Sequence, residues 1–276
     1  MCRILPVRPN EEEQVTNTID ISYLSLAAFL GLILVPVLAC AVLGLGITKR
    51  VLIGVLRMTV QMAVLGLYLD YLFRFNHIAV NFGWALLMIF IANITVNRSA
   101  GLKTSKIFFS VMAGIFVGSL TVIALFVFLA IQPKPFYDAR YLIPVTGMVV
   151  GNCMRANVIS LERFYSSVKK NEKTFLTYLL LGASLREAAL PSIREAVKPA
   201  LAPTLSTMAT LGLVSLPGMM TGQILGGASP ITAIKYQIAI MIAIFTAITL
   251  STVINLLIGL RVSFNEYHML RKDIFR

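Results

Sequence analysis

Apolar stretches of about 20 residues recur along this chain of 276 residues, and they limit what it can fold into. Each stretch is long enough to cross a hydrocarbon core about 30 Å thick as an α-helix, which rises about 1.5 Å per residue. No strand-like alternation is visible, and backbone groups inside lipid must pair within their own segment. Hydrophobic residues make up 58% of the chain and charged residues only 13%. A soluble domain carries about 25% charged residues. The sequence therefore predicts an all-α polytopic membrane protein and excludes a soluble globular enzyme.

Seven apolar segments are predicted to span the membrane. In chain order they are Ile21–Ile47, Val51–Phe73, Ile78–Val96, Ile107–Ile131, Tyr141–Ile159, Leu201–Leu225 and Ile231–Leu260.

Basic residues predict the orientation of these spans. Most Lys and Arg residues lie after the first, third and fifth spans and in the tail 261–276. Because cytoplasmic loops collect positive charge, we expect the N-terminus outside and the C-terminus in the cytoplasm. The predicted parts are an extracytoplasmic arm (1–20), one transmembrane domain (21–260) and a cytoplasmic tail (261–276). The same rule accounts for the net charge of +12, so the expected partner is the lipid bilayer and no nucleic acid is expected.

The cytoplasmic segment 160–200 between the fifth and sixth spans reads as a string of short helices. A helix over Glu172–Leu181 is predicted to end at Gly182, a common helix stop. Ser184 and Glu187 then fit a capping box, and Pro191 repeats a helix-start signal. Such a segment suits either a docking element for a partner or an amphipathic helix lying on lipid headgroups. The candidate docking residues are Leu181, Gly182, Ala183, Ser184 and Glu187.

Several strings resemble a known family. Leu181–Ser184, followed by Lys198–Leu201, resembles the coupling-loop motif of ABC-transporter permeases. Ile143–Met148 and the long string Gly212–Gly222 (GLVSLPGMMTG) are similar to the iron-export ABC permease family, small bacterial permeases with plant relatives linked to aluminium tolerance. The resemblance covers about Val51 to Leu260.

This resemblance implies a permease subunit that exports iron or another metal ion. It implies no cofactor in this chain, with ATP and Mg²⁺ bound by a separate ATPase subunit that docks on the cytoplasmic segment, and a homodimer of permeases. The expected location is a bacterial inner membrane or another plasma membrane or endomembrane. Two alternatives stay open: an ATP-independent channel or carrier, and an ABC permease for another small cargo such as a nucleotide sugar.

Polar and sulfur-containing residues inside the spans are candidates for a transport pathway. A charge within a bilayer should face protein or water, so Arg57 and Gln61, one turn apart, are either a gate or a clamp between helices. Pro217 breaks the sixth span beside a glycine-spaced face, which favours either bending or close packing. The candidates on this segment are Pro217, Gly218, Met219, Met220, Gly222 and Gln223. The pairs Gly114/Gly118 and Gly147/Gly151 predict close helix approach.

A transition metal could contact four neighbouring residues in the fifth span, because thioether, thiolate and amide groups are available there. They are Met148, Asn152, Cys153 and Met154. Packing is the alternative interpretation for each.

No catalytic site is predicted. The motifs HExxH, GxSxG and Walker A are absent from the sequence, and His77 and His268 fall at opposite predicted faces. Asp70 is the only acidic residue in a predicted span, which argues against a carboxylate relay. The three cysteines are widely spaced, so neither a disulfide framework nor a zinc site is indicated.

Overall fold

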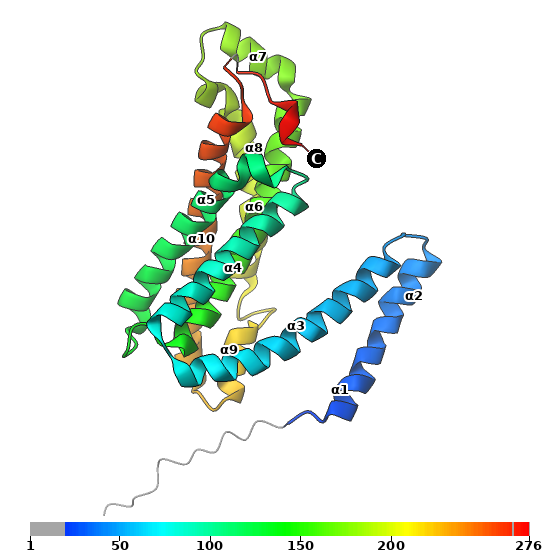
Figure 1. The fold of residues 1–276 in the computed structure, drawn as a ribbon, viewed down its shortest axis with the longest axis vertical. Helices are drawn as coiled ribbons and strands as arrows, with labels where there is room; N and C mark the ends of the chain where they lie inside the picture. Colours follow the sequence, from blue (N-terminus) through cyan, green and yellow to red (C-terminus); the bar gives the residue numbers. More distant parts are fainter. Residues whose placement is uncertain (1–19, 267, 276) are drawn as a thin grey trace, which may run out of the picture. The chain divides into compact units, whose positions relative to one another are not determined.

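A computed structural model describes residues 20–266 and 268–275 (Figure 1). Helices dominate these residues, and β pairing occurs among them only as isolated bridges. Six helical segments are long and apolar enough to cross a membrane. The prediction of an all-α polytopic membrane protein is confirmed. The predicted arm 1–20, including Cys2, lies outside the described residues except for Asp20.

The helices follow one another through the chain with short connections. In order they are α1 (Tyr23–Leu30), η1 (Gly31–Ile33), α2 (Leu34–Val42), α3 (Thr48–Phe75), α4 (Ile78–Ser99), α5 (Thr104–Leu125), η2 (Phe126–Ile131), α6 (Ala139–Lys170), α7 (Glu172–Leu180), α8 (Leu185–Thr210), α9 (Gly218–Leu225), α10 (Pro230–Ser263) and η3 (Lys272–Ile274).

Local side-chain chemistry sets several of these boundaries. His77 caps α4 by accepting a hydrogen bond from the Ala79 N–H at 3.3 Å, and Asp138 caps α6 by accepting from the Arg140 N–H at 3.0 Å. Both side chains satisfy donors that a helix start leaves free. The first predicted span contains a 3₁₀ turn at η1, just before Pro36, whose missing N–H interrupts regular α-helical bonding.

The chain divides into two compact units, which we describe separately. The first comprises residues up to Tyr71 and Gly218–Ile234, so it holds α1, α2, most of α3 and α9. The second comprises Leu72–Pro217 and Lys235–Arg276. In this second unit α4, α5 and α6 pack against one another, and α8 packs against α6 and α7.

Helices α6 and α10 of the second unit lie side by side and run parallel. Asn157 contacts Ser251, and eight residues further along α6 Tyr165 contacts Ser263 near the end of α10. Apolar side chains from several helices fill the centre of this unit. Fully buried members include Val96, Val111, Ile115, Val149, Leu161, Ile248 and Leu256.

Close contact between α5 and α10 depends on two glycines. A Cβ built on Gly114 would lie 2.7 Å from the Ser251 carbonyl oxygen, and one on Gly118 would lie 2.8 Å from the Ser251 nitrogen. The predicted close approach at this pair is confirmed. At Gly147 the nearest atom is Met88 Cε at 3.7 Å, and at Gly151 no described atom lies within 4 Å. The prediction of close approach at that second pair is therefore wrong within one chain.

Two helices are longer than the sequence predicts. Helix α6 continues from Ile159 to Lys170 because Leu161, Phe164 and Val168 keep an apolar stripe that stays buried after the helix leaves its apolar span. Helix α8 runs unbroken through Pro191, where a second helix start is predicted. The hydrogen bond lost at Pro191 would have used the carbonyl of Glu187, an exposed residue whose carbonyl can bond to water.

The predicted sixth span, Leu201–Leu225, is divided between two helices. Helix α8 ends at Thr210, the chain is non-helical over 211–217, and α9 begins at Gly218. The break predicted at Pro217 is present, and it extends over the six residues before this proline as well.

Candidate functional site

The turn between α7 and α8 (residues 180–184, called the α7–α8 turn) has a fixed backbone. Gly182 adopts a φ of +91°, and its N–H donates to the Leu179 carbonyl at 3.0 Å. The Ala183 N–H donates to the Tyr178 carbonyl at 3.0 Å, which completes a Schellman motif. The predicted helix stop at Gly182 is therefore confirmed. A residue with a Cβ would be strained at this φ.

A capping box starts α8 immediately after this turn. The Ser184 hydroxyl accepts a hydrogen bond from the Glu187 N–H at 3.4 Å, while the Glu187 carboxylate accepts one from the Ser184 N–H at 2.8 Å. The Ser184 hydroxyl also donates to this carboxylate at 2.7 Å. Hydrogen bonds from the Ser184 hydroxyl and then from its N–H lower the pKa of Glu187. The predicted capping box is confirmed, and both ends of the turn are held locally.

The α7–α8 turn presents apolar side chains to its surroundings. Leu180 is 88% exposed and Leu181 is 79% exposed. Ala183 is half-buried, while Gly182, Ser184 and Glu187 are exposed. Two adjacent leucines on a turn held by local hydrogen bonds form a small preformed apolar surface of the kind that binds in a groove on another protein.

Polar contacts fasten the first part of α8 to the end of α6. The Ser167 hydroxyl lies 3.0 Å from the Ser192 hydroxyl and 2.6 Å from the Glu195 carboxylate. Next to them, Ala188, Ala189, Ile193 and Ala196 form the buried face of α8. Small residues on this face let α8 lie close to α6, so the α7–α8 turn is held by a packed helical base.

The break after α8 contains non-helical backbone and exposed apolar side chains. Gly212 has a φ of +81°, and its N–H donates to the Ser215 carbonyl at 3.1 Å. Leu213 is 88% exposed and Val214 is 83% exposed. Because free backbone groups are costly in lipid, a non-helical segment at membrane depth belongs against protein or beside a water-filled cavity.

The pathway candidates of the sixth predicted span lie at the start of α9 and just before it. Pro217, Met219, Met220 and Gln223 are half-buried, while Gly218 and Gly222 are exposed. No described atom lies within 4 Å of a Cβ built on Gly222. Close packing at Gly222 is therefore not observed within one chain.

Arg57 and Gln61 lie one turn apart on α3, as predicted, and both side chains are exposed. Their position places a charged group and an amide in a helix of 28 residues that is long and apolar enough to cross a membrane. Such a pair requires polar surroundings in a membrane.

The four metal candidates on α6 do not converge. Met148 and Asn152 share a helix face, where the Asn152 amide donates to the Met148 carbonyl at 2.8 Å. Cys153 is fully buried, on the side of α6 near Ser251 of α10. Met154 lies two residues after Asn152, about 200° away around the helix. The described residues also contain no cluster of three or more His, Cys, Asp or Glu side chains suited to a metal.

A buried polar network that is not predicted from the sequence joins α6 to α10. The Asn157 amide donates to the Ser251 hydroxyl at 2.6 Å, and the Asn255 amide donates to the Asn157 oxygen at 2.8 Å. All three side chains are fully buried. We call Asn157, Ser251 and Asn255 the α6–α10 polar network. The sequence signal that could have indicated this network is the pair Ser251 and Asn255, two polar residues one helical turn apart in the last apolar span.

Comparisons with known proteins identify relatives over most of the chain. The UPF0014 membrane protein slr1647 of Synechocystis sp. is 33% identical over 258 residues, which cover 91% of this chain and 97% of the relative. Protein ALUMINUM SENSITIVE 3 of Arabidopsis thaliana is 31% identical over 254 residues, covering 90% of each. The protein named "Probable iron export permease protein FetB" of Escherichia coli is 31% identical over 255 residues, covering 92% of this chain and 96% of the relative.

No solved structure matches the chain. The family model described as "Uncharacterised protein family (UPF0014)" matches residues 23–264. This range contains every string on which the family resemblance rests, and that resemblance is confirmed. The chain is an integral membrane protein of the UPF0014 family.

Proposed function

We propose that this chain is the permease subunit of an ABC transporter that exports iron or another metal ion. A separate ATPase subunit, which binds ATP and Mg²⁺, drives transport by docking on the α7–α8 turn. The observation that carries this proposal is the exposed Leu180–Leu181 pair on a prefolded turn. The cargo and the direction follow the relative named as a probable iron export permease.

The energetics of the turn favour docking of a partner. Burying one leucine side chain completely contributes about 1.5–3 kcal/mol. The Schellman motif and the capping box fix the turn before any partner arrives, so little ordering entropy is lost on association. A lipid-bound amphipathic helix would need an apolar stripe along its length, whereas the exposed leucines are adjacent at the tip of a hairpin.

Helix α8 supplies a connection from this turn toward the predicted pathway. It is continuous from Leu185 to Thr210 and leads directly into the non-helical segment 211–217. A displacement of the turn therefore moves a helix that is followed in the chain, after the segment 211–217, by the pathway candidates on α9. The thioether groups of the half-buried Met219 and Met220 suit brief contact with a soft or borderline metal ion.

A second copy of the chain is part of the proposal. Arg57 and Gln61 are exposed on α3 of one chain and need a polar environment within the bilayer. A homodimer with an aqueous pathway between permeases provides that environment, and it presents two α7–α8 turns to two ATPase subunits.

The test is a pull-down of the tagged chain from native membranes in mild detergent, followed by an ATPase assay on the eluate. We expect a nucleotide-binding subunit to co-purify with the wild type and with Leu213→Ser, a control whose side chain is 88% exposed away from the turn. We expect its loss from Leu180→Ser/Leu181→Ser. These changes leave the backbone at Gly182 unstrained, which Gly182→Arg would not.

Metal export is tested with the reconstituted complex in proteoliposomes. ATP-dependent movement of Fe²⁺ across the membrane, absent from the double serine variant, is the expected result. A wild-type chain that elutes alone and still transports without ATP would refute the proposal in favour of an independent channel or carrier.

A further inference from the structure

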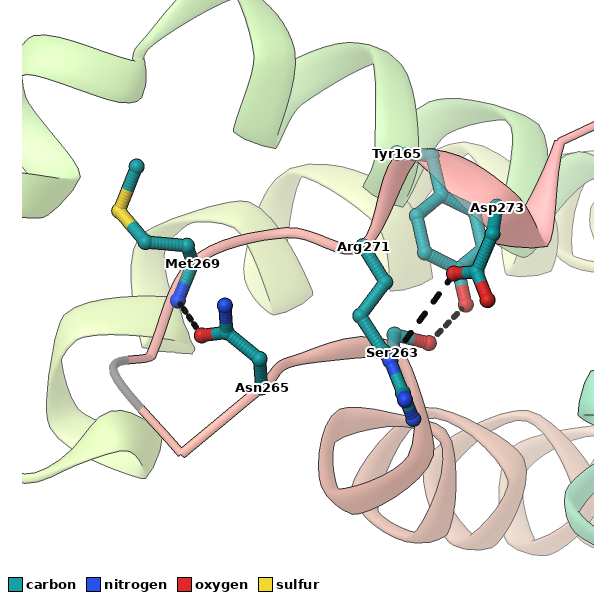
Figure 2. A network of polar contacts seen from close by, with 6 residues as sticks. All are labelled: Tyr165, Ser263, Asn265, Met269, Arg271 and Asp273. Atoms are coloured by element: carbon teal, nitrogen blue, oxygen red, sulfur yellow. Dashed lines mark hydrogen bonds and ion pairs between the residues drawn. The ribbon is translucent and has the colours of Figure 1, made fainter.

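The tail that follows α10 folds back onto the ends of other helices. After Ser263, the Asn265 side chain accepts a hydrogen bond from the Met269 N–H at 2.8 Å (Figure 2). The Arg271 N–H then returns to the Ser263 carbonyl at 2.9 Å, and Phe264 forms an antiparallel bridge with Leu270. The family match ends at residue 264, so the tail (residues 264–275) lies almost entirely beyond it.

The far end of the tail is fixed to the turn between α4 and α5. Phe275 forms an antiparallel bridge with Leu102, and the Lys103 N–H donates to the Ile274 carbonyl at 2.8 Å. Ile274 and Leu102 are both fully buried. This end is therefore held by main-chain hydrogen bonding together with apolar burial.

Aromatic contacts attach the same segment to α6. The Phe275 ring lies 5.5 Å from the Tyr165 ring, edge to face, and the Lys169 ammonium lies 3.5 Å from the Phe275 centroid. The Tyr165 hydroxyl also hydrogen-bonds the Ser263 hydroxyl at 2.6 Å (Figure 2). In contrast, the Arg271–Asp273 ion pair is long at 3.9 Å and exposed, so it adds little.

The near end of the tail touches α7. The Phe264 ring lies 5.3 Å from the Phe175 ring, and both side chains are buried. Beside this contact is a cavity of about 360 Å³, lined by Glu172 and Leu176 of α7 and by His268 and Met269 of the tail. Helix α7 thus touches the tail through Phe175, and the cavity between α7 and the tail leaves the rest of this face room to move.

We propose that the tail is a strap that links α7 mechanically to α10, to the end of α6 and to the α4–α5 turn. Movement of the α7–α8 turn then reaches these helices through Phe175 and Phe264, in addition to the direct route through α8. This assignment rests on the proposed function for its role in transport, while the mechanical link itself does not.

Phe275→Ala tests the strap at its far end in the sequence, where Phe275 contacts Tyr165 and Lys169. The variant removes the ring packed on Tyr165 and Lys169 and leaves Phe264 in place. Hydrogen exchange of the full-length chain in detergent is measured for amides 172–180. We expect about tenfold faster exchange there, since the lost aromatic and cation–π contacts restrain α7 through the strap. Phe275→Tyr keeps the ring and should restore slow exchange.

Phe29→Ala is the matched control, because it removes an identical ring that is 71% exposed on α1. A complementary variant, Leu176→Phe, fills part of the cavity without weakening the strap, and we expect slower exchange over 172–180. Wild-type exchange in Phe275→Ala, or unchanged exchange in a folded Leu176→Phe variant, would overturn the link.

The role in transport has a separate readout. With the ATPase partner present, we expect Phe275→Ala to bind it as the wild type does and to move about tenfold fewer ions per ATP hydrolysed. An unchanged ratio would overturn that role. If the wild type binds no ATPase, the proposed function fails, while the exchange data still decide whether the strap exists.

Discussion

Replacing Gly118 with alanine tests the close contact between α5 and α10. A Cβ at this position would lie 2.8 Å from the Ser251 nitrogen and 2.9 Å from the Ser251 Cα. These are main-chain atoms, so no rotation of a side chain can relieve the clash and α5 must move away from α10. Overpacking of this kind costs about 1–3 kcal/mol. That cost outweighs the roughly 0.5–1 kcal/mol that alanine gains over glycine within a helix.

The assay is thermal unfolding of the purified chain in detergent, beside Gly151→Ala as a matched control. Alanine at Gly151, on α6, meets no described atom within 4 Å. The net loss of about 1–2 kcal/mol, at about 2–4 °C per kcal/mol, should lower the Tm of Gly118→Ala by roughly 2–8 °C. Gly151→Ala should leave the Tm unchanged or raise it. A Tm for Gly118→Ala equal to that of Gly151→Ala would show that α5 and α10 are not in close contact.

Three further outcomes follow from local contacts. Asn157→Ala should destabilise the chain by about 1–3 kcal/mol in thermal unfolding, because it leaves buried polar groups of Ser251 and Asn255 without their partner; an unchanged Tm would contradict the α6–α10 polar network. The pKa of the Glu187 carboxyl is lowered in the folded chain. The ionised carboxylate therefore stabilises the fold fully above the unfolded pKa of about 4.3, and this stabilisation is lost as the pH falls through the folded pKa. The acid-side fall in Tm should thus be smaller in Glu187→Gln, and an identical pH profile would contradict this. Gly212→Ala should lower the free energy of unfolding by about 1–2 kcal/mol in thermal unfolding, because alanine is strained at the φ of +81° found there. An unchanged Tm would show that this turn accommodates alanine without cost.

Local signals predict much of the helical framework. The apolar runs place α3, α4 and α10 to within a few residues, since hydrocarbon thickness imposes a length that composition records directly. The α7–α8 turn is equally predictable, because Gly182, Ser184 and Glu187 act through bonds within a few residues of each other.

Features that depend on distant residues are predicted less well. Asn157 resembles any other polar residue in a span until α10 brings Ser251 and Asn255 beside it. The extension of α6 to Lys170 requires partners that bury Phe164 and Val168 beyond the apolar span, and neither partner is visible in the local sequence. Pro217 predicts a break, yet the length of that break also depends on the turn around Gly212.

The same distinction holds for the candidate metal residues. Met148, Asn152, Cys153 and Met154 are near one another in sequence, but a helix turns about 100° per residue and directs neighbours to different sides. Cys153 consequently faces Ser251 and is fully buried. Proximity in sequence is evidence for a shared site only where the spacing matches the helical repeat, as it does for Met148 and Asn152.

Helix α8 is unbroken along its length, but it bends more easily near its three prolines. Its 26 residues correspond to a rod about 39 Å long, so a tilt of about 10° at one end would displace the other by about 7 Å. However, Pro191, Pro199 and Pro203 each remove one backbone hydrogen bond, which lowers the resistance of the helix to bending around them. Part of any push applied at Leu185 is therefore stored as curvature before it reaches Thr210. Under the proposed function, α8 acts as a flexible lever. Its bending stiffness then determines what fraction of the displacement caused by the ATPase reaches Thr210.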